Sequence, residues 1–267
     1  MTVILVRHGR STANTSGVLA GRTPGVSLDE KGREQASALL ERLGVCIGEI
    51  SAVARSPLDR CAQTVAPLMA ALDADPDRDV PELVVDALAE VDYGAWTNRP
   101  IKDLLSEPLW KTVQQHPSAA VFPDGEGLAN VQARAVAAVR DLDRRFGGAD
   151  GSGVWVACSH GDVIKAIIAD AMGMHLDSFQ RIVVEPASIS VIRYGATRPY
   201  VHTVNSTAVL SVPPPHKEKP AQGAPESDGN GAPGDGASAD DAVVGGSTGV
   251  DDRDRDVRAA AAPLPRG

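Results

Sequence analysis

The sequence has little of what stabilises small secreted domains. Aromatic residues make up only 3% of the 267 residues, so a core drawn from the 43% hydrophobic fraction must consist mainly of Val, Leu, Ile and Ala. The three cysteines, Cys46, Cys61 and Cys158, are odd in number and lack CxxC spacing. This pattern argues against both a disulfide framework and a structural zinc site, and we expect reduced, partly buried thiols.

Long apolar runs and an excess of basic charge are also missing. Arg7 interrupts the first apolar run, VILV, after four residues, so we expect no signal peptide and no membrane span, and a cytoplasmic protein. The formal net charge is −9, from 26 basic and 35 acidic side chains. This balance argues against nucleic acid and anionic membranes as partners. Any bound anion therefore requires a local cluster of cations.

The composition divides the chain near Ser211. Residues 212–267 are rich in Pro, Gly, Ala and Asp, have few large apolar residues, and carry 6 basic and 10 acidic side chains. Such a segment buries too little apolar surface to offset the entropy of ordering, so we expect a disordered tail. An inert tail and a docking segment are both consistent with this composition. Residues 1–211 are predicted to form one folded domain.

Within this domain, apolar strands alternate with segments of helical periodicity, which predicts a layered α/β fold. The predicted strands cover residues 2–6, 51–54, 83–86, 153–158, 188–194 and 200–204, the last two as a hairpin at a sheet edge. The predicted helices follow Asp29 as N-cap, follow Ser56 as N-cap with Pro57 as first helical residue, cover residues 128–146, and cover residues 161–173. Between residues 101 and 123 we expect short helices that act as a cover.

Two of the predicted strands end in a His-Gly pair. The segment VILVRHGRS contains His8, and the segment VWVACSHGD contains His160. Ligands of an open α/β sheet collect at the carboxyl ends of its strands, where helix N-termini also point. A glycine after the histidine lets backbone N–H groups approach a ligand closely. One such pair is weak support for a site, whereas two form a pattern.

Arginines accompany these histidines. Arg7 directly precedes His8, and Arg60 falls in the first turn of the helix expected after Ser56. A guanidinium keeps its proton near neutral pH, and its planar fork matches two phosphate oxygens. The sequence therefore predicts a phosphate pocket. Glu90, in the segment LAEVDYGAW, would be the proton donor for the leaving group.

Four ordered motifs resemble those of the histidine phosphatase superfamily, in its phosphoglycerate mutase-like branch. They are RHG at the start, SPLxR before a helix, LxExxxGxW in the middle and SHG near the end, and the resemblance covers residues 1–205. It implies a three-layer α/β/α sandwich with a mostly parallel central sheet and an antiparallel edge. Arg10 and Gly127 depart from the family pattern and leave the substrate open; Arg10 would place an extra positive charge at the rim of the site.

The resemblance implies a role for each central residue. His8 would be the nucleophile that becomes a phosphohistidine, with a partner on its other ring nitrogen that fixes the tautomer. Arg7, Arg60 and His160 would hold the equatorial phosphate oxygens. Glu90 would protonate the departing alkoxide and then activate water.

Other residues have subsidiary roles or none. Asn14 and the backbone at Gly21 and Gly161 would be additional donors to the phosphate. Because the arginines supply the positive charge, no metal and no other cofactor is expected. Arg55 is an alternative pocket arginine, but it precedes the expected N-cap and would point elsewhere, and Cys158 is expected in the core. The histidines without partners at ligand spacing are His116, His175, His202 and His216.

Three functions fit these residues. The first is a metal-independent phosphomonoester hydrolase acting on a small phosphorylated metabolite, the second is a phosphomutase, and the third is a phosphate-binding module without catalysis. Only 70 positions separate Glu90 from His160, and their basic residues do not form the dense insert that the family's mutases use to retain the intermediate. Hydrolysis is therefore favoured. Oligomeric state is left open.

Overall fold

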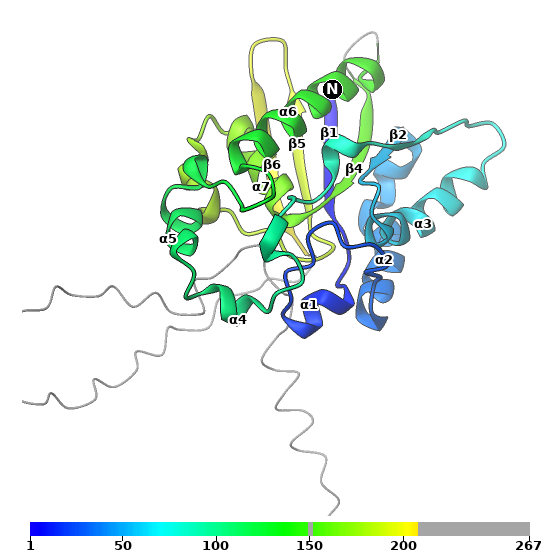
Figure 1. Ribbon diagram of the computed structural model, residues 1–267. Helices are drawn as coiled ribbons and strands as arrows, with labels where there is room; N and C mark the ends of the chain where they lie inside the picture. Colours follow the sequence, from blue (N-terminus) through cyan, green and yellow to red (C-terminus); the bar gives the residue numbers. More distant parts are fainter. Residues whose placement is uncertain (149–151, 208–267) are drawn as a thin grey trace, which may run out of the picture.

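The computed structural model describes residues 1–148 and 152–207 (Figure 1). These residues include nearly all of the domain expected over residues 1–211. The end of that domain and the tail predicted over residues 212–267 lie outside the described residues.

The described residues form a six-stranded mixed sheet in the order β3-β2-β4-β1-β5-β6. The strands are β1 (Thr2–Arg7), β2 (Ile50–Arg55), β3 (Glu82–Val84), β4 (Val154–Ser159), β5 (Ile189–Tyr194) and β6 (Pro199–Ser206). The pairings among β1, β2, β3 and β4 are parallel, whereas β5 pairs antiparallel with both β1 and β6. The expected parallel sheet with an antiparallel hairpin at its edge is confirmed.

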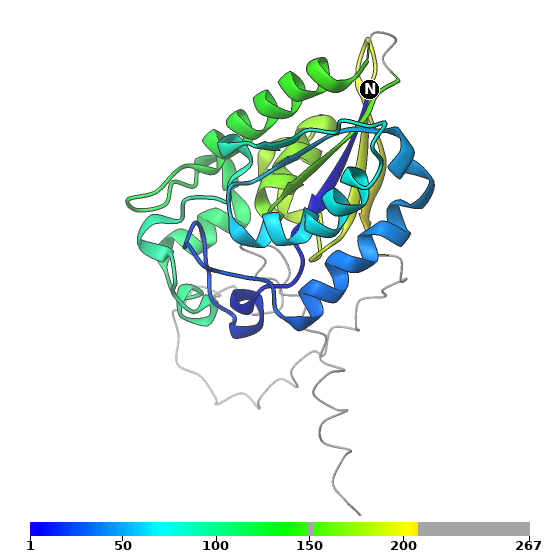
Figure 2. The same ribbon diagram turned by 90° about the vertical axis from the view of Figure 1, so that its right-hand side faces the viewer.

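Side-chain alternation along the central strands builds a core on each face of the sheet. In β1, Val3 and Leu5 belong to one buried cluster, and Ile4 and Val6 belong to the other. The helices α6 (Leu128–Phe146) and α7 (Gly161–Ala171) pack on the first face, and α2 (Glu30–Leu43) and α3 (Asp59–Asp73) pack on the second. Figure 2 shows the sheet between these two helical layers. The three-layer α/β/α sandwich is therefore confirmed.

Helix boundaries agree with the sequence except at α3. The Asp29 side chain accepts a hydrogen bond from Gly32 N at 2.8 Å and caps α2 as expected. Beyond the end of α7, Gly173 has φ +66°, as a helix C-terminus near this glycine predicts. The prediction that Ser56 caps α3 is wrong, because the helix begins at Asp59 with Leu58 as N-cap and no side-chain cap.

The short helices expected between residues 101 and 123 are present. They are α4 (Ile101–Leu104), α5 (Pro108–Gln115) and the 3₁₀ turn η4 (Pro117–Ala119). Aromatic side chains gather beneath them: Trp96 and Trp110 stack with ring centroids 6.0 Å apart, and Phe122 contacts Trp96 edge-on. The few aromatic residues of the chain thus fasten this cover to the domain.

The remaining elements are short. They are α1 (Thr12–Ser16) and the 3₁₀ helices η1 (Gly44–Glu49), η2 (Asp86–Leu88), η3 (Gly94–Trp96) and η5 (Leu176–Arg181). Within the described ranges, we find no helix whose length and apolar character would let it cross a membrane. All three cysteines are free thiols, and Cys61 and Cys158 are buried.

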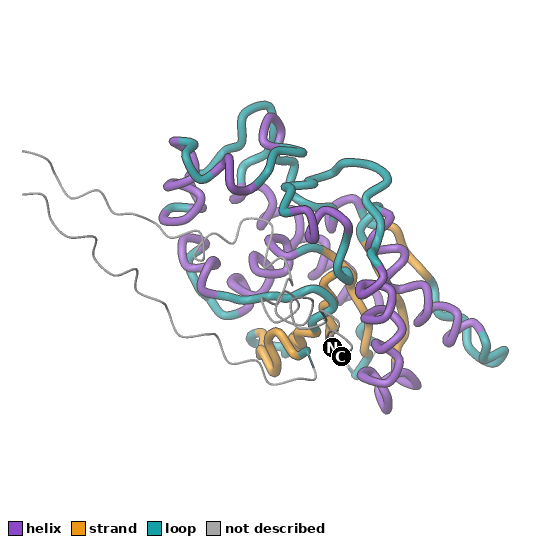
Figure 3. The backbone as a smooth tube through the Cα atoms, turned by 90° about the horizontal axis from the view of Figure 1, so that it is seen from below, coloured by secondary structure: helices purple, strands orange, loops and turns teal. Residues whose placement is uncertain are grey.

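The segment after β1 lies in direct backbone contact with the first turn of α2. A Cβ atom on Gly9 would lie 2.6 Å from the carbonyl oxygen of Gly32, and a Cβ atom on Gly32 would lie 1.9 Å from that of Arg10. Any larger residue at either position would separate the helix from the segment that carries His8. Figure 3 shows the molecule from the side on which β1 ends, where loops run between the helices.

Gly32→Ala is expected to destabilise the protein by about 1–3 kcal/mol, because the added methyl group meets rigid backbone rather than a movable side chain. This cost exceeds the gain of up to about 1 kcal/mol that alanine brings to a helix. Urea unfolding measures the difference. Gly48→Ala is the matched control, since a Cβ there meets no described atom within 4 Å. Equal stability of Gly32→Ala and the parent chain would contradict the packing argument.

Candidate active site

Two parallel neighbours, β1 and β4, bring the two predicted histidines together. His8 follows β1 and His160 follows β4, and the preceding residues, Arg7 and Ser159, are paired in the sheet. The two imidazole rings lie with their centroids 5.1 Å apart and meet edge-on. Both side chains are buried. The convergence that the motifs predict is therefore present in the fold.

The His8 ring is held in one tautomer. Its Nδ1 lies 2.7 Å from the carbonyl oxygen of Gly9, which can only accept a hydrogen bond, so Nδ1 carries the proton. The lone pair of Nε2 then faces Arg60, whose Nε lies 3.3 Å away. Burial, together with the charges of Arg60 and Arg7, holds the pKa of His8 well below its usual range. A neutral imidazole with an unprotonated Nε2 can act as a nucleophile.

The main chain at His8 is fixed by a residue that the sequence does not reveal. Ala187 N–H lies 3.1 Å from the carbonyl oxygens of both Arg7 and His8. Ala187 has φ +58°, which is unfavourable for a residue with a Cβ atom. Arg42, on α2, donates to the carbonyl oxygen of Ala187 at 2.6 Å and holds this conformation in place.

Arg60 occupies the centre of the cluster. The Nη2 group of Arg60 donates to the carbonyl oxygen of Gly21 at 2.9 Å and lies 3.2 Å from His160 Nδ1. Its Nη1 is buried, and nothing within residues 1–148 and 152–207 accepts a hydrogen bond from it. A buried guanidinium donor without an acceptor is costly unless an anion binds there.

Arg7 supplies a second buried cation. Its Nη1 donates to the carbonyl oxygen of Val184 at 2.6 Å. Burial lowers the pKa of Arg7 to about 10, and the charges of Glu90 and Asp162 oppose that change, so the guanidinium stays protonated at neutral pH. Two positive charges thus surround the histidines in a region from which water is largely excluded.

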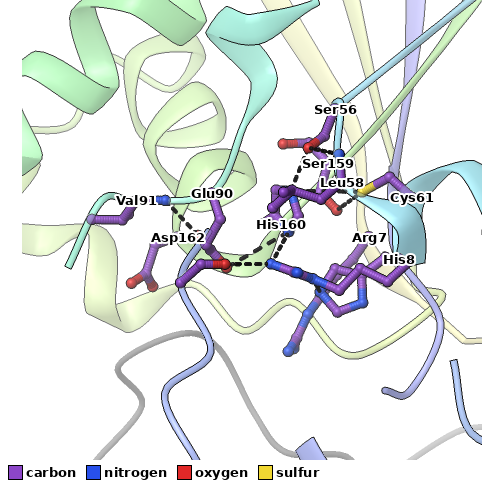
Figure 4. Close-up of polar contacts among 12 residues, drawn as sticks. Arg7, His8, Ser56, Leu58, Cys61, Glu90, Val91, Ser159, His160 and Asp162 are labelled. Atoms are coloured by element: carbon purple, nitrogen blue, oxygen red, sulfur yellow. Dashed lines mark hydrogen bonds and ion pairs between the residues drawn. The ribbon is translucent and has the colours of Figure 1, made fainter. Parts of the chain in front are cut away.

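Ser56 positions His160 and is a site residue that sequence reasoning missed. The Ser56 hydroxyl lies 2.7 Å from His160 Nε2 and accepts from Leu58 N at 3.3 Å. Since Arg60 donates to His160 Nδ1, the proton of the neutral ring lies on Nε2 and is donated to Ser56. Figure 4 shows His160 between Ser56 and Glu90. The signal was the position of Ser56 directly after β2, which we had assigned to helix capping.

Glu90 lies at the opposite side of His160. Its Oε2 is 3.7 Å from His160 Nδ1, and its Oε1 accepts from Val91 N at 2.9 Å. Burial, and then the negative charge of Asp162, raises the pKa of Glu90 to about 7. A carboxyl with this pKa is protonated in part of the population at neutral pH, which suits a proton donor. Glu90 follows the turn η2 rather than the strand we expected.

Asp162, in the first turn of α7, belongs to a buried polar group, and its negative charge acts on Glu90. Tyr93 donates its hydroxyl to Asp162 Oδ2 at 2.9 Å, and Lys165 Nζ lies 3.7 Å from Asp162 Oδ1. Burial lowers the pKa of Lys165, which has no exposed surface. Sequence reasoning assigned no role to Asp162, although it follows the SHG motif directly.

Three other predicted site residues reach the site differently. Asn14 uses its Oδ1 to accept from Ser11 N and Ser11 Oγ, at 3.0 and 2.8 Å, within the cap of α1. Gly21 contacts Arg60 through its carbonyl oxygen rather than through the N–H group that we expected to bind phosphate. Gly161 is the first residue of α7 and is buried beside His160. Their roles toward phosphate remain predictions.

Position 9, directly after His8, requires glycine for a reason other than the one we expected. Gly9 N–H donates to Thr64 Oγ1 at 2.9 Å, so it is not directed at a ligand. The absence of a Cβ at Gly9 instead admits the backbone of Gly32. The idea that Gly9 frees its N–H for a ligand is therefore wrong for this residue.

The structure also shows the ion-pair partners of Arg10 and Arg55, two arginines outside the histidine cluster. Arg10 Nε donates to Asp29 Oδ2 at 2.6 Å, and both side chains are largely buried, so the extra positive charge that we expected at the rim is neutralised. Arg55 pairs with Glu82, on β3, so its side chain has a partner other than the histidines. In the part of the chain that the structure describes, no three His, Cys, Asp or Glu side chains are grouped so that they could hold a metal ion.

Comparison with known proteins agrees with this geometry. A family model described as "Histidine phosphatase superfamily (branch 1)" matches residues 3–207. An adenosylcobalamin/α-ribazole phosphatase of Escherichia coli is 28% identical over 215 residues, which cover 78% of this chain and 98% of that protein.

Solved structures support the same fold. The α-ribazole phosphatase of Shigella flexneri superposes with a TM-score of 0.62 at 24% identity, covering 80% of this chain and 100% of that one. A mycobacterial glucosyl-3-phosphoglycerate phosphatase superposes with a TM-score of 0.66 at 22% identity, covering 77% and 99%. The family model spans more than half of the chain and all four motifs, so the protein belongs to branch 1 of the histidine phosphatase superfamily and is a phosphatase of that superfamily.

Proposed function

We propose that the protein is a metal-independent phosphomonoester hydrolase that forms a phosphohistidine on His8 and acts on a small phosphorylated metabolite. The observation that carries this proposal is the unprotonated Nε2 of His8 beside Arg60, whose Nη1 is buried with no acceptor among the described residues. A phosphoryl oxygen would satisfy that donor and bring phosphorus to the His8 nitrogen.

The first chemical step follows from these positions. The Nε2–P bond forms while the bond from phosphorus to the leaving oxygen breaks, and Glu90 gives its proton to that oxygen. Arg7 and Arg60 donate to the other phosphoryl oxygens and offset the charge that they carry. His160 holds one of these oxygens in its other tautomer, in which Nδ1 carries the proton and Ser56 donates its hydroxyl to Nε2. Asn14, Gly21 and Gly161 are proposed to contribute further polar contacts through their side-chain amide or backbone.

The second step returns the enzyme to its starting state. Water attacks phosphorus, Glu90 takes a proton from that water, and the N–P bond breaks to release inorganic phosphate and free His8. A phosphomutase would instead pass the phosphoryl group to a second hydroxyl of the bound molecule. The phosphatase names of the relatives favour hydrolysis, as does the short connection between Glu90 and His160, whose basic residues form no dense cluster.

The substrate is proposed only as a class. The Escherichia coli relative is named for α-ribazole and adenosylcobalamin, and sequence identity of 28% supports a shared reaction more than a shared substrate. A cytoplasmic location, and the absence of nucleic acid and membrane partners, remain predictions from the sequence.

Incubation with a panel of phosphorylated metabolites, with a chelator present, is expected to release inorganic phosphate without an isomerised product. His8→Ala is expected to lower the rate at least about 10³-fold, because no other group accepts the phosphoryl. Brief reaction with a labelled phosphate ester should leave acid-labile, base-stable label on the parent chain but not on this variant. His202→Ala, which alters an exposed histidine on β6, is the control.

Other outcomes would decide between the alternatives. An isomerised product that depends on a bisphosphate primer would identify a mutase. Binding of phosphate by a wild-type chain with no turnover, and equal binding by His8→Ala, would identify a non-catalytic module.

The rate with an alkyl phosphate is expected to fall as the pH rises through about 7, because Glu90 must be protonated to donate and its pKa is raised to about 7. A substrate whose leaving group needs no proton, such as 2,4-dinitrophenyl phosphate, should not show this fall. No loss of rate from protonation of His8 is expected down to pH 6, because its pKa lies well below the usual range. Steady-state pH profiles with the two substrates test this.

Asp162→Asn tests whether this pH dependence comes from Glu90, because the substitution should shift the fall in rate in a known direction. Removal of the negative charge that raises the pKa of Glu90 should move the fall in rate to lower pH. Asp143→Asn, which also changes a buried carboxylate bonded to an aromatic donor, Trp155 at 3.2 Å, should leave it in place. A fall that stays at the same pH in Asp162→Asn would refute the assignment of Glu90 as the donor.

A further inference from the structure

Glu90 differs from the other central residues in what supports its main chain. His8 and His160 follow strands of the central sheet, and Arg60 lies on α3, whereas Glu90 lies in the irregular segment after η2. A proton donor displaced by about 1 Å loses much of its effect, on the order of 10²-fold in rate. The structure must therefore hold this segment by other means.

Two arginines from distant parts of the chain bind the carbonyl oxygen of Glu90. Arg22, in the loop after α1, donates through Nε at 2.8 Å, and Arg134, on α6, donates through Nη2 at 3.2 Å. Arg134 Nη1 also donates to the carbonyl oxygen of Ala87 at 2.7 Å. Both guanidinium groups thus bind the main chain of Glu90, and Arg134 also binds η2 itself.

Glu126 holds the two arginines together. Its Oε1 accepts from Arg22 Nη2 at 2.8 Å and from Arg134 Nη2 at 2.7 Å, and its Oε2 accepts from Arg134 Nε at 3.1 Å. Asp92 N also donates to Glu126 Oε1, at 2.9 Å. Although burial alone would raise it, the hydrogen bonds from Arg134 and Asp92 hold the pKa of Glu126 below its ordinary value. The carboxylate is therefore charged at every pH near neutrality.

We propose that Arg22, Glu126 and Arg134 form a positioning clasp that fixes the main chain of Glu90 so that its buried carboxyl can reach the leaving oxygen. The two arginines bind Glu90 through its main-chain carbonyl and make no contact with its carboxyl group. The Glu90 side chain is buried, with 5% of its surface exposed, and lies beside His160. It joins the loop after α1, the segment after η2 and the start of α6. This inference rests on the proposed role of Glu90 as proton donor.

A positioning role predicts a selective loss. Glu126→Gln cannot bind two guanidinium groups with charge assistance, so Glu90 should lose its fixed position. We expect the first-turnover rate of phosphohistidine formation with an alkyl phosphate to fall 10- to 100-fold, on the order of the cost of a misplaced group. The burst rate of 2,4-dinitrophenol release from 2,4-dinitrophenyl phosphate, a step in which Glu90 gives no proton, should stay within about twofold. A role in stability alone would lower both rates equally.

Asp170→Asn is the matched control. Asp170 Oδ2 accepts from Arg140 Nη2 at 2.7 Å, so this pair also joins α6 to another element but lies outside the site. It should change neither rate. Urea unfolding of both variants checks that the Glu126→Gln chain is folded under the assay conditions.

Titration of Glu90 tests the clasp without turnover. Glu90 is observed by ¹³C NMR of glutamate-labelled protein and assigned by its loss in Glu90→Gln. Arg22→Met is the decisive variant, because loss of a positive charge alone would raise the pKa of Glu90, whereas release of its segment into water would lower it from about 7. We expect it to fall.

Failure of the proposed function and failure of the clasp can be distinguished by experiment. A wild-type chain that hydrolyses neither substrate would refute the proposed function, and the NMR titration would still decide whether the clasp positions Glu90. A Glu90 pKa unchanged or raised in Arg22→Met, or equal losses on both substrates in Glu126→Gln, would overturn the clasp.

Discussion

The burial of two guanidinium groups beside two neutral histidines is the constraint on which the rest of this structure depends. Arg7 keeps its charge, while desolvation and the positive charges of Arg60 and Arg7 hold the pKa of His8 and of His160 well below the usual range, so both rings are neutral. Such a cluster is unfavourable by itself and is offset by main-chain acceptors at Val184 and Gly21. Arg60 Nη1 is buried with no acceptor among the described residues, and in our proposal a phosphoryl oxygen accepts from it, so the electrostatic cost of this buried donor becomes affinity for phosphate.

The fold meets this constraint with few long-range contacts. Pairing of β1 with β4 sets the distance between the two histidines, and the approach of Gly9 to Gly32 sets how closely α2 and the first loop can meet. The unfavourable φ of Ala187 is maintained because its N–H and carbonyl groups are both bonded to fixed partners. The strained conformation of Ala187 thus holds the main chain at Arg7 and at His8, the nucleophile in our proposal.

Much of this arrangement could be predicted from the sequence, because strand ends and ordered motifs are local signals. VILVRHG and VWVACSHG each show an apolar strand that stops at a histidine, and the sheet topology then brings them together. The start of α3 could not be predicted, since Ser56 is equally suited to capping and to binding His160, and only the tertiary contact decides. Likewise Ala187 carries no mark of its positive φ, and the clasp depends on residues more than 100 positions apart.

These differences follow a division within the site itself. The groups that we propose to bind the phosphoryl moiety lie on or directly after β1, on α3 and at the turn from β4 to α7, whose positions the sheet fixes. Glu90, which serves the leaving oxygen in our proposal, lies in a segment held by hydrogen bonds from Arg22 and Arg134, and both arginines pair with Glu126. Because phosphate is common to all substrates and the leaving group is not, the rigid half can stay constant while the clasped half accommodates a different alcohol. Sequence motifs describe the first half well for that reason, and substrate choice is expected to reside in the second.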